Sequence, residues 1–230
     1  MKFKPILIVA GEPNSIFSEI FFKTLNSIKI KKPIILIASN KVLKLQMKKL
    51  NFKKKIKLLN HQKLNEFKLD NKSINLINIE FNQRKAFEKI SNKSKKYIKL
   101  SFDLAFKIIK HYKINKVING PISKKSFLEK KYLGMTEYIS KKFSVEKTCM
   151  LIYNKNLSVC PLTTHLPIKL VAKKINRINI SEKVFLINNF YLKNFGFKPK
   201  IAILGLNPHC ESILENNEDE KIIKPTIRYL

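Results

Sequence analysis

The stretch KPILIVAGEP, residues 4–13, gives the first indication of the fold, because a short β-branched apolar run ends there in a Gly-Glu-Pro turn. The run is too short for the apolar core of a signal peptide and fits a buried first strand. A similar run, KPIILIAS, occupies residues 32–39, and an amphipathic segment, residues 18–28, lies between the two. This order of strand, helix and strand is typical of a βα unit in a parallel sheet.

The same alternation continues along the chain. Apolar residues recur at helical spacing in residues 93–112, and the strand KVING follows at residues 116–120. Further strands are predicted at residues 149–153, 157–162 and 200–204, and a helix is predicted from Ser181, as its N-cap, to Gly196. We therefore expect a three-layer α/β/α fold with a mostly parallel sheet. A change in the motifs near Asn119 suggests two α/β domains, residues 1–118 and 119–230.

The composition is that of a globular protein with a large positive charge. Of the 230 residues, 44% are hydrophobic, and the formal net charge is +31. Such a charge favours polyanionic partners, yet only three basic residues are arginine, the side chain that best reads phosphates and guanines. Abundant lysine, asparagine and isoleucine instead indicate A/T-rich codons. Specific nucleic-acid binding is therefore not expected, and weak adhesion to polyanions remains open.

Cysteine usage and hydropathy indicate the compartment. The three cysteines form no C-x-x-C pair, which argues against a disulfide framework or a zinc ribbon. No apolar stretch approaches the roughly 20 residues needed to cross a bilayer. We expect a cytoplasmic protein that does not enter the membrane.

Four of the five glycines follow a predicted strand or lie in a polar loop: Gly11, Gly120, Gly134 and Gly205. Glycine suits a turn where the backbone needs unusual dihedral angles or must approach a ligand closely. In open α/β sheets, ligands bind outside the carboxyl ends of the strands. These loops are therefore either parts of one ligand site or ordinary tight turns.

Two of the four histidines stand next to such loops. His165 lies in TTHLP and His209 in GLNPH, each just past a predicted strand. We expect both imidazoles on one rim of the fold, together with Gly11 and Gly120. Neutral imidazole is a common ligand of divalent metals, but two histidines far apart in sequence form no local metal motif. Hydrogen-bonded structural histidines remain the alternative.

Two further loops carry polar groups. NGPISKK places Lys124 at a turn, where its charge suits a phosphate or a carboxylate. GMTEY places Thr136 beside Gly134. Each loop is equally consistent with a helix cap, the common use of Ser and Thr at such positions. The motifs assign no catalytic residue and no cofactor-binding residue.

In order and spacing, GEP, NGPISK, GMTEY, TTHLPIK and LGLNPHCES resemble the 4-hydroxythreonine-4-phosphate dehydrogenase family of vitamin B6 biosynthesis. The resemblance spans the whole chain, and TTHLP with GLNPH is its most specific part. It implies a homodimer of two-domain subunits related to isocitrate and isopropylmalate dehydrogenases. It also implies a divalent metal (zinc, cobalt or magnesium), bound by three histidines at the subunit interface, and NAD or NADP as hydride acceptor. His165 and His209 match the first two metal ligands.

The resemblance further implies a reaction and its substrate contacts. The family oxidises 4-hydroxythreonine 4-phosphate to a β-keto acid that decarboxylates to 3-amino-2-oxopropyl phosphate. Met135 and Thr136 match family positions at this phosphorylated amino-acid substrate.

Three departures from the family pattern define the alternatives. Ser15 and Phe17 stand where the family has small residues after the first strand, and Met135 replaces a polar histidine. The chain also stops, apparently within a helix, before the C-terminal third that holds the third metal histidine in the family. The alternatives are a catalytically silent homologue that binds a metabolite or a partner subunit, and a basic nucleic-acid-binding protein.

Overall fold

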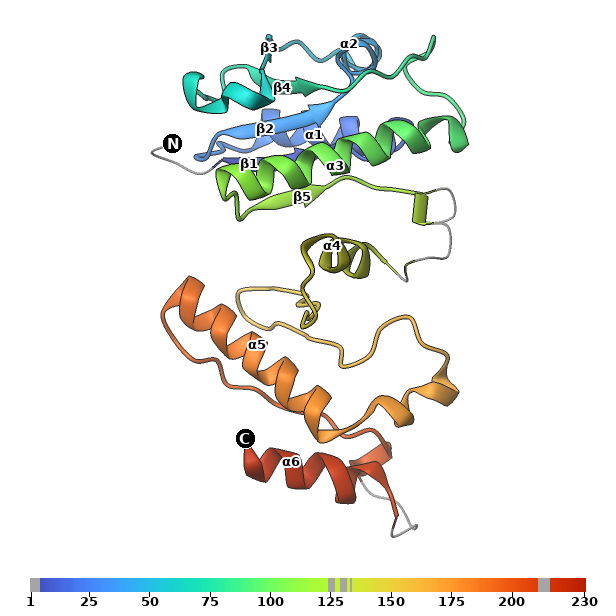
Figure 1. Cartoon of the computed structure of the whole chain (residues 1–230), viewed down its shortest axis with the longest axis vertical. Helices are drawn as coiled ribbons and strands as arrows, with labels where there is room; N and C mark the ends of the chain where they lie inside the picture. The colour runs from blue at the N-terminus through green and yellow to red at the C-terminus, as the bar shows by residue number, and fades with distance from the viewer. Residues whose placement is uncertain (1–4, 124–126, 129–131, 133, 211–215) are drawn as a thin grey trace. The chain divides into compact units, whose positions relative to one another are not determined.

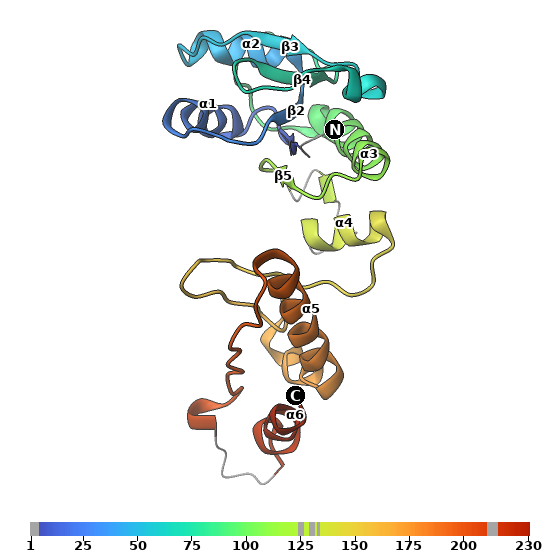
Figure 2. The same cartoon turned by 90° about the vertical axis from the view of Figure 1, so that its left-hand side faces the viewer.

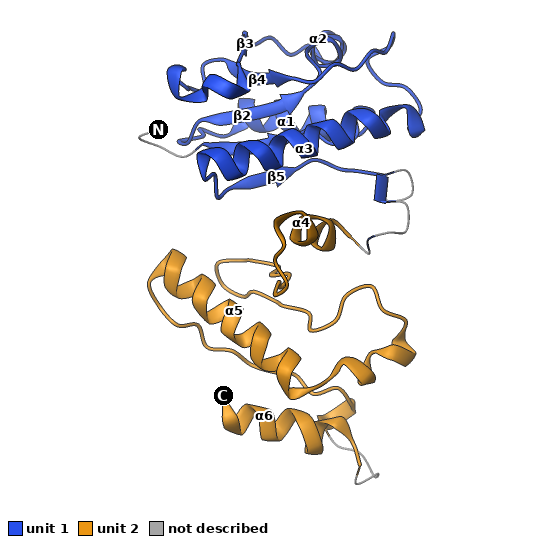
Figure 3. Ribbon diagram, viewed as in Figure 1, with its two compact units in different colours: residues 1–132 blue, residues 133–230 orange. Residues whose placement is uncertain are grey.

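The computed structural model describes residues 5–123, 127–128, 132, 134–210 and 216–230. The chain divides into two compact units, a first unit of residues 1–132 and a second unit of residues 133–230 (Figure 3). In the described ranges no helix combines the length and the hydropathy that a membrane span requires.

The first unit is built on a five-stranded sheet in which every neighbouring pair of strands is parallel. The strand order is β3-β4-β2-β1-β5. The strands are β1 (Ile6–Val9), β2 (Ile34–Ala38), β3 (Ile56–Leu58), β4 (Ile74–Asn78) and β5 (Val117–Asn119). The connecting helices are α1 (Phe17–Ser27), α2 (Asn40–Lys49) and α3 (Lys95–Tyr112). The predicted parallel α/β fold is confirmed in this unit, and the expected boundary at residue 119 falls at the end of β5.

Helices cover both faces of the sheet, with α1 and α2 on one face and α3 on the other (Figures 1 and 2). Successive side chains of a strand point in opposite directions, so alternate residues serve opposite faces. Ile8 and Leu36 join the core under α1 and α2, where the rings of Phe22 and Phe52 stack 4.3 Å apart. Leu7, which is fully buried and precedes Ile8 in β1, belongs to the opposite face, which α3 covers. The result is the expected α/β/α layering.

The second unit is mainly helical in its described residues. Its helices are α4 (Met135–Phe143), α5 (Arg177–Phe195) and α6 (Lys224–Tyr229), the last preceded by a π-helical turn, Asp219–Ile223. Short 3-10 turns occupy Ile168–Leu170, Ala172–Lys174 and Pro208–Cys210. A small core of Ile175, Ile180 and Ile223 joins the start of α5 to the π-helical turn.

The three strands expected in the second unit are absent from its described residues. Only Ile152 and Val159 pair, through two antiparallel backbone hydrogen bonds of 2.8 and 3.0 Å. The expectation was wrong because β-branched composition favours a strand only when a neighbouring strand satisfies its backbone groups and covers one of its faces. Here Ile152 is 59% exposed and Leu204, in the expected strand at residues 200–204, is 83% exposed.

The helix expected to begin at Ser181 begins earlier, at Arg177. The side chain of Asn176 accepts a hydrogen bond of 2.9 Å from the Asn179 backbone N–H and caps the first turn. Ile175 and Ile180 flank this cap within the same buried cluster, the arrangement of a hydrophobic staple. Two local signals at Asn176 therefore outweigh the serine, and the predicted end at Gly196, with φ 80°, is confirmed.

Candidate functional site

Two glycine turns join the carboxyl ends of the neighbouring strands β1 and β5. Gly11 has φ 76°, and a β carbon on it would lie 2.4 Å from the carbonyl oxygen of Pro121. A β carbon on Gly120 would lie 2.0 Å from the carbonyl oxygen of Ala10. The Glu12 N–H donates a 2.8 Å hydrogen bond to Pro121 across the two turns. The prediction that the two glycines share one rim of the sheet is confirmed, and the placement of both histidines on this rim stays a prediction.

The turn after β1 holds a buried carboxylate that the sequence analysis missed. Glu12 is 1% exposed and accepts hydrogen bonds from the Ser94 hydroxyl (2.6 Å) and the Asn14 N–H (3.2 Å). A cavity of about 20 Å³ beside it is lined by Glu12, Ser18 and Tyr97, among others, enough for one water molecule. Burial raises the pKa of Tyr97 well above its ordinary value, so its hydroxyl stays neutral. The sequence signal that could have identified Glu12 is its place in the turn that follows a fully apolar strand.

The bulky residue after β1 packs inward. Phe17 opens α1, and its ring stacks on Phe21 with centroids 5.5 Å apart. Its Cδ2 atom lies 2.8 Å from the position that a β carbon on Gly120 would take. The Phe17 ring thus occupies the space that a side chain at Gly120 would need. The hydroxyl of Ser15 accepts a hydrogen bond from the Phe17 N–H.

In the second unit, His165 lies beside the start of α4. Gly134 is the N-cap of this helix, and Met135, Thr136 and Glu137 form its first turn. A β carbon on Gly134 would lie 3.0 Å from Glu137 Oε2 and 3.8 Å from His165 Nε2. The structure therefore brings the histidine close to the segment that carries Met135 and Thr136, both half-buried. Lys124 lies outside the described residues.

Both candidate metal ligands have a left-handed backbone. Six described non-glycine residues have positive φ, and three of them lie at helix ends, where left-handed residues are common: Asn51, Lys113 and Ser144. The other three are His165 (φ 57°), His209 (φ 59°) and Cys210 (φ 56°). Strained conformations away from helix ends concentrate at functional sites. The dihedral angles thus select both histidines independently of the sequence motif.

Neither histidine is a buried structural residue. His165 and His209 are both exposed, and within the described ranges neither imidazole has a hydrogen-bond or ion-pair partner. A structural histidine would be expected to bond its ring nitrogens to neighbours. The exposed rings remain available to an external ligand.

The turn that carries His209 contains a left-handed residue. The Cys210 N–H donates a 3.0 Å hydrogen bond to the carbonyl oxygen of Asn207, which closes the turn across Pro208 and His209. His209 has φ 59° and ψ 8°, within the left-handed region that glycine adopts most readily. The sequence therefore carries a histidine where the backbone favours a smaller residue.

The donor set fits part of a metal site. Exposed imidazoles suit zinc or cobalt, whereas magnesium prefers oxygen ligands. No three His, Cys, Asp or Glu side chains of the described segments are grouped so as to hold a metal ion. His165 and His209 therefore fit as two ligands of a site that the described residues do not complete.

The parallel sheet of the first unit and the exposed, left-handed histidines of the second place the chain among α/β proteins with a candidate ligand site. The chain belongs to the family of the pyridoxal phosphate biosynthetic protein PdxA, whose family model matches residues 29–230.

Two relatives illustrate the match. A 4-hydroxythreonine-4-phosphate dehydrogenase from Sulfurihydrogenibium sp. is 34% identical over 234 residues, which cover 98% of this chain and 70% of the relative. The enzyme of the same name from Aquifex aeolicus is 37% identical over 111 residues, 46% of this chain and 34% of the relative. The first similarity extends over nearly all of the chain.

Solved structures show the same fold. The 4-hydroxythreonine-4-phosphate dehydrogenase from Klebsiella pneumoniae superposes with a TM-score of 0.81 at 20% identity, covering 98% of this chain and 71% of that one. The Burkholderia phymatum enzyme gives a TM-score of 0.78 at 21% identity, covering 99% and 70%. At such low identity, the likeness concerns the fold.

Proposed function

We propose that this protein is an NAD- or NADP-linked dehydrogenase that oxidises 4-hydroxythreonine 4-phosphate in the synthesis of pyridoxal phosphate. The observation that carries the proposal is the left-handed, exposed backbone position of both His165 and His209. These two residues match the family's metal ligands, and backbone strain of this kind clusters at ligand-binding and active sites.

The reaction transfers a hydride from the substrate's secondary carbinol carbon to the nicotinamide, while the hydroxyl proton leaves to a base or to solvent. The β-keto acid formed in this way loses its carboxylate as carbon dioxide, and protonation of the remaining enolate gives 3-amino-2-oxopropyl phosphate. His165 and His209 would hold a zinc or cobalt ion, or a magnesium ion with further oxygen ligands, and this ion would supply Lewis-acid stabilisation of negative charge on oxygen. The chain's own contribution is to hold both imidazoles at fixed, exposed positions.

Substrate contacts are proposed at three positions. Thr136 and Met135 lie in the first turn of α4, next to Gly134 and within reach of the His165 loop. Thr136 offers a hydroxyl, and Met135 offers an apolar contact in place of a hydrogen bond. Lys124 is proposed to neutralise the substrate's phosphate or carboxylate. We also propose a cytoplasmic homodimer whose partner subunit completes the site.

A third relative suggests the competing substrate. A D-threonate 4-phosphate dehydrogenase from Pectobacterium atrosepticum is 29% identical over 136 residues, 54% of this chain. Methionine at position 135 removes a polar contact from the family pattern, so a substrate that differs in polar groups is the natural comparison.

The test is reduction of NAD and NADP by the purified 230-residue chain with zinc, cobalt or magnesium. We expect turnover with 4-hydroxythreonine 4-phosphate to exceed turnover with D-threonate 4-phosphate, with carbon dioxide released in step. Faster turnover of D-threonate 4-phosphate would reassign the substrate. A folded protein that binds the phosphorylated substrate without reducing either cofactor would be the silent homologue. Sequence-selective binding to DNA or RNA that persists at high salt would instead favour the nucleic-acid alternative.

A further inference from the structure

The His209 turn requires an external restraint. A non-glycine residue in the left-handed region costs about 1–2 kcal/mol, and both His209 and Cys210 occupy it. Strain of this kind persists only when surrounding contacts fix the backbone. The turn's own hydrogen bond, from Cys210 to Asn207, is a single contact on a half-exposed loop.

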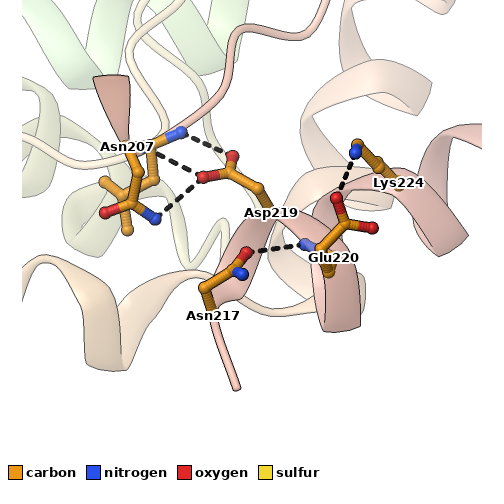
Figure 4. Close-up of polar contacts among 6 residues, drawn as sticks. Asn207, Asn217, Asp219, Glu220 and Lys224 are labelled. Atoms are coloured by element: carbon orange, nitrogen blue, oxygen red, sulfur yellow. Dashed lines mark hydrogen bonds and ion pairs between the residues drawn. The ribbon is translucent and has the colours of Figure 1, made fainter. Parts of the chain in front are cut away.

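The restraint comes from the carboxylate of Asp219, which accepts hydrogen bonds from the loop just before the turn (Figure 4). Its Oδ1 accepts a 2.8 Å hydrogen bond from the Leu206 N–H. Its Oδ2 accepts bonds from the Asn207 N–H (3.0 Å) and from the Asn207 side-chain amide (2.8 Å). Asp219 is 1% exposed, so these charge-assisted bonds are shielded from water. One side chain thus fixes two consecutive peptide groups that lead into His209.

Gly205 makes this close approach sterically possible. A β carbon at this position would lie 2.9 Å from Asp219 Oδ1 and 2.4 Å from Cys210 Sγ. The glycine of the GLNPH motif therefore leaves room both for the Asp219 carboxylate and for the Cys210 side chain.

The carboxylate itself is anchored by a helix. Asp219 begins the π-helical turn that continues into α6, and the Asn217 side chain accepts a 2.9 Å hydrogen bond from the Glu220 N–H in its first residues. Burial alone would raise the pKa of Asp219, but the hydrogen bonds from the loop and the charge of Lys224 hold it below its ordinary value. The group is therefore an anion at neutral pH, with its acceptor sites directed at the loop.

We propose that Asp219 is a positioning residue that holds the loop of residues 205–210 so that the His209 imidazole is presented to its ligand. The importance of His209 itself rests on the proposed function. Asp219 acts through the backbone of Leu206 and Asn207, and it needs no contact with substrate, metal or cofactor for this role.

The test compares Asp219→Asn with Glu220→Gln in the full chain. Both substitutions remove one negative charge from the same helical turn, but the Glu220 carboxylate pairs with Lys224, whereas the amides of Leu206 and Asn207 bond to Asp219. In Asp219→Asn we expect amide exchange at Leu206 and Asn207 to accelerate about tenfold or more. We expect its cobalt affinity, measured by calorimetry, to fall about 10–100-fold, the usual effect of losing a supporting contact around a metal ligand. Glu220→Gln should match the wild type in both measurements.

Other results would overturn the proposal. Unchanged exchange in Asp219→Asn would mean that the carboxylate does not hold the loop. Faster exchange with unchanged cobalt affinity would reduce Asp219 to a structural role. If Asp219→Asn does not fold, Asn207→Ala removes one of the three bonds and should lower cobalt affinity in the same direction, and unchanged affinity would again contradict the proposal.

The experiment also separates this inference from the proposed function. If the wild type binds no cobalt, the metal assignment fails. The positioning role is then decided by the imidazole carbon resonances of His209, which should shift in Asp219→Asn and not in Glu220→Gln. Unchanged resonances would contradict the positioning role.

Discussion

Replacing His209 with glycine should make the protein more stable while it removes the imidazole. His209 has φ 59° and ψ 8°, in the left-handed region that glycine adopts most readily. Glycine would relieve a strain of about 1–2 kcal/mol. It would also cost about 0.4–1 kcal/mol of stability, because glycine makes the unfolded chain more flexible.

The net expectation is a gain of about 0.5–1 kcal/mol in the free energy of unfolding. For a chain of this size, 1 kcal/mol corresponds to a rise of about 2–4 °C in melting temperature. Thermal unfolding followed by circular dichroism and by calorimetry would resolve this shift, and calorimetry would also show whether the two units unfold separately.

His209→Ala is the matched control. It removes the same imidazole but keeps a β carbon in the left-handed region, so it should not stabilise the protein. If the glycine variant melts at or below the alanine variant, the turn is not strained and the argument that selects His209 from its backbone fails.

Three further outcomes are expected. Gly120→Ala should lower the free energy of unfolding by about 3 kcal/mol, because its β carbon would overlap backbone atoms. Gly196→Ala, with open space around the new β carbon, should lower it by only about 1 kcal/mol. Equal urea midpoints of the two variants would contradict this difference. A thiol reagent at neutral pH should modify exposed Cys210 first and Cys160 slowly, because burial and the neighbouring Cys149 thiol raise the pKa of Cys160. Peptide mapping gives the order of modification, and equal rates at the two cysteines would contradict this prediction. The pKa of Asp219 is lower in the folded protein than in the unfolded chain. Its contribution to stability is therefore present above the unfolded pKa of about 3.9 and is lost as the pH falls through the folded pKa. Superimposable acid-unfolding curves of the wild type and Asp219→Asn would contradict this prediction.

The first unit was predictable because local signals and tertiary structure agree there. Ile34–Ala38 is a continuous apolar run, and all five of its residues are buried, as expected of a central parallel strand covered on both faces. Gly11 and Gly120 were identified from their position after strands, and the close approach of their backbones explains why neither position has room for a β carbon.

The second unit was less predictable because its β-branched segments have few neighbours in the described residues. Composition at residues 149–153 and 157–162 indicates strands, but only Ile152 and Val159 exchange hydrogen bonds. Strand pairing depends on residues distant in sequence, which composition does not reveal.

Within the candidate site, the sequence motifs drew attention to two histidines and missed the residue that bonds to the loop before one of them. His165 and His209 followed from their motifs, and their dihedral angles agree with a functional role. Asp219 escaped notice because it bonds to residues more than ten positions earlier, within a run of charged residues that looks solvated. Glu12 was read as part of a turn, although its carboxylate is buried against Ser94.

The most direct test of the central claim is a nuclear magnetic resonance titration of the imidazole groups with zinc in the presence of 4-hydroxythreonine 4-phosphate. The chain has only four histidines, and His165→Ala and His209→Ala assign two of the signals. The signals of His165 and His209 should move together at the same zinc concentration, while those of His61 and His111 stay in place. Movement of His61 or His111, or unchanged signals from His165 and His209, would contradict the assignment of the site.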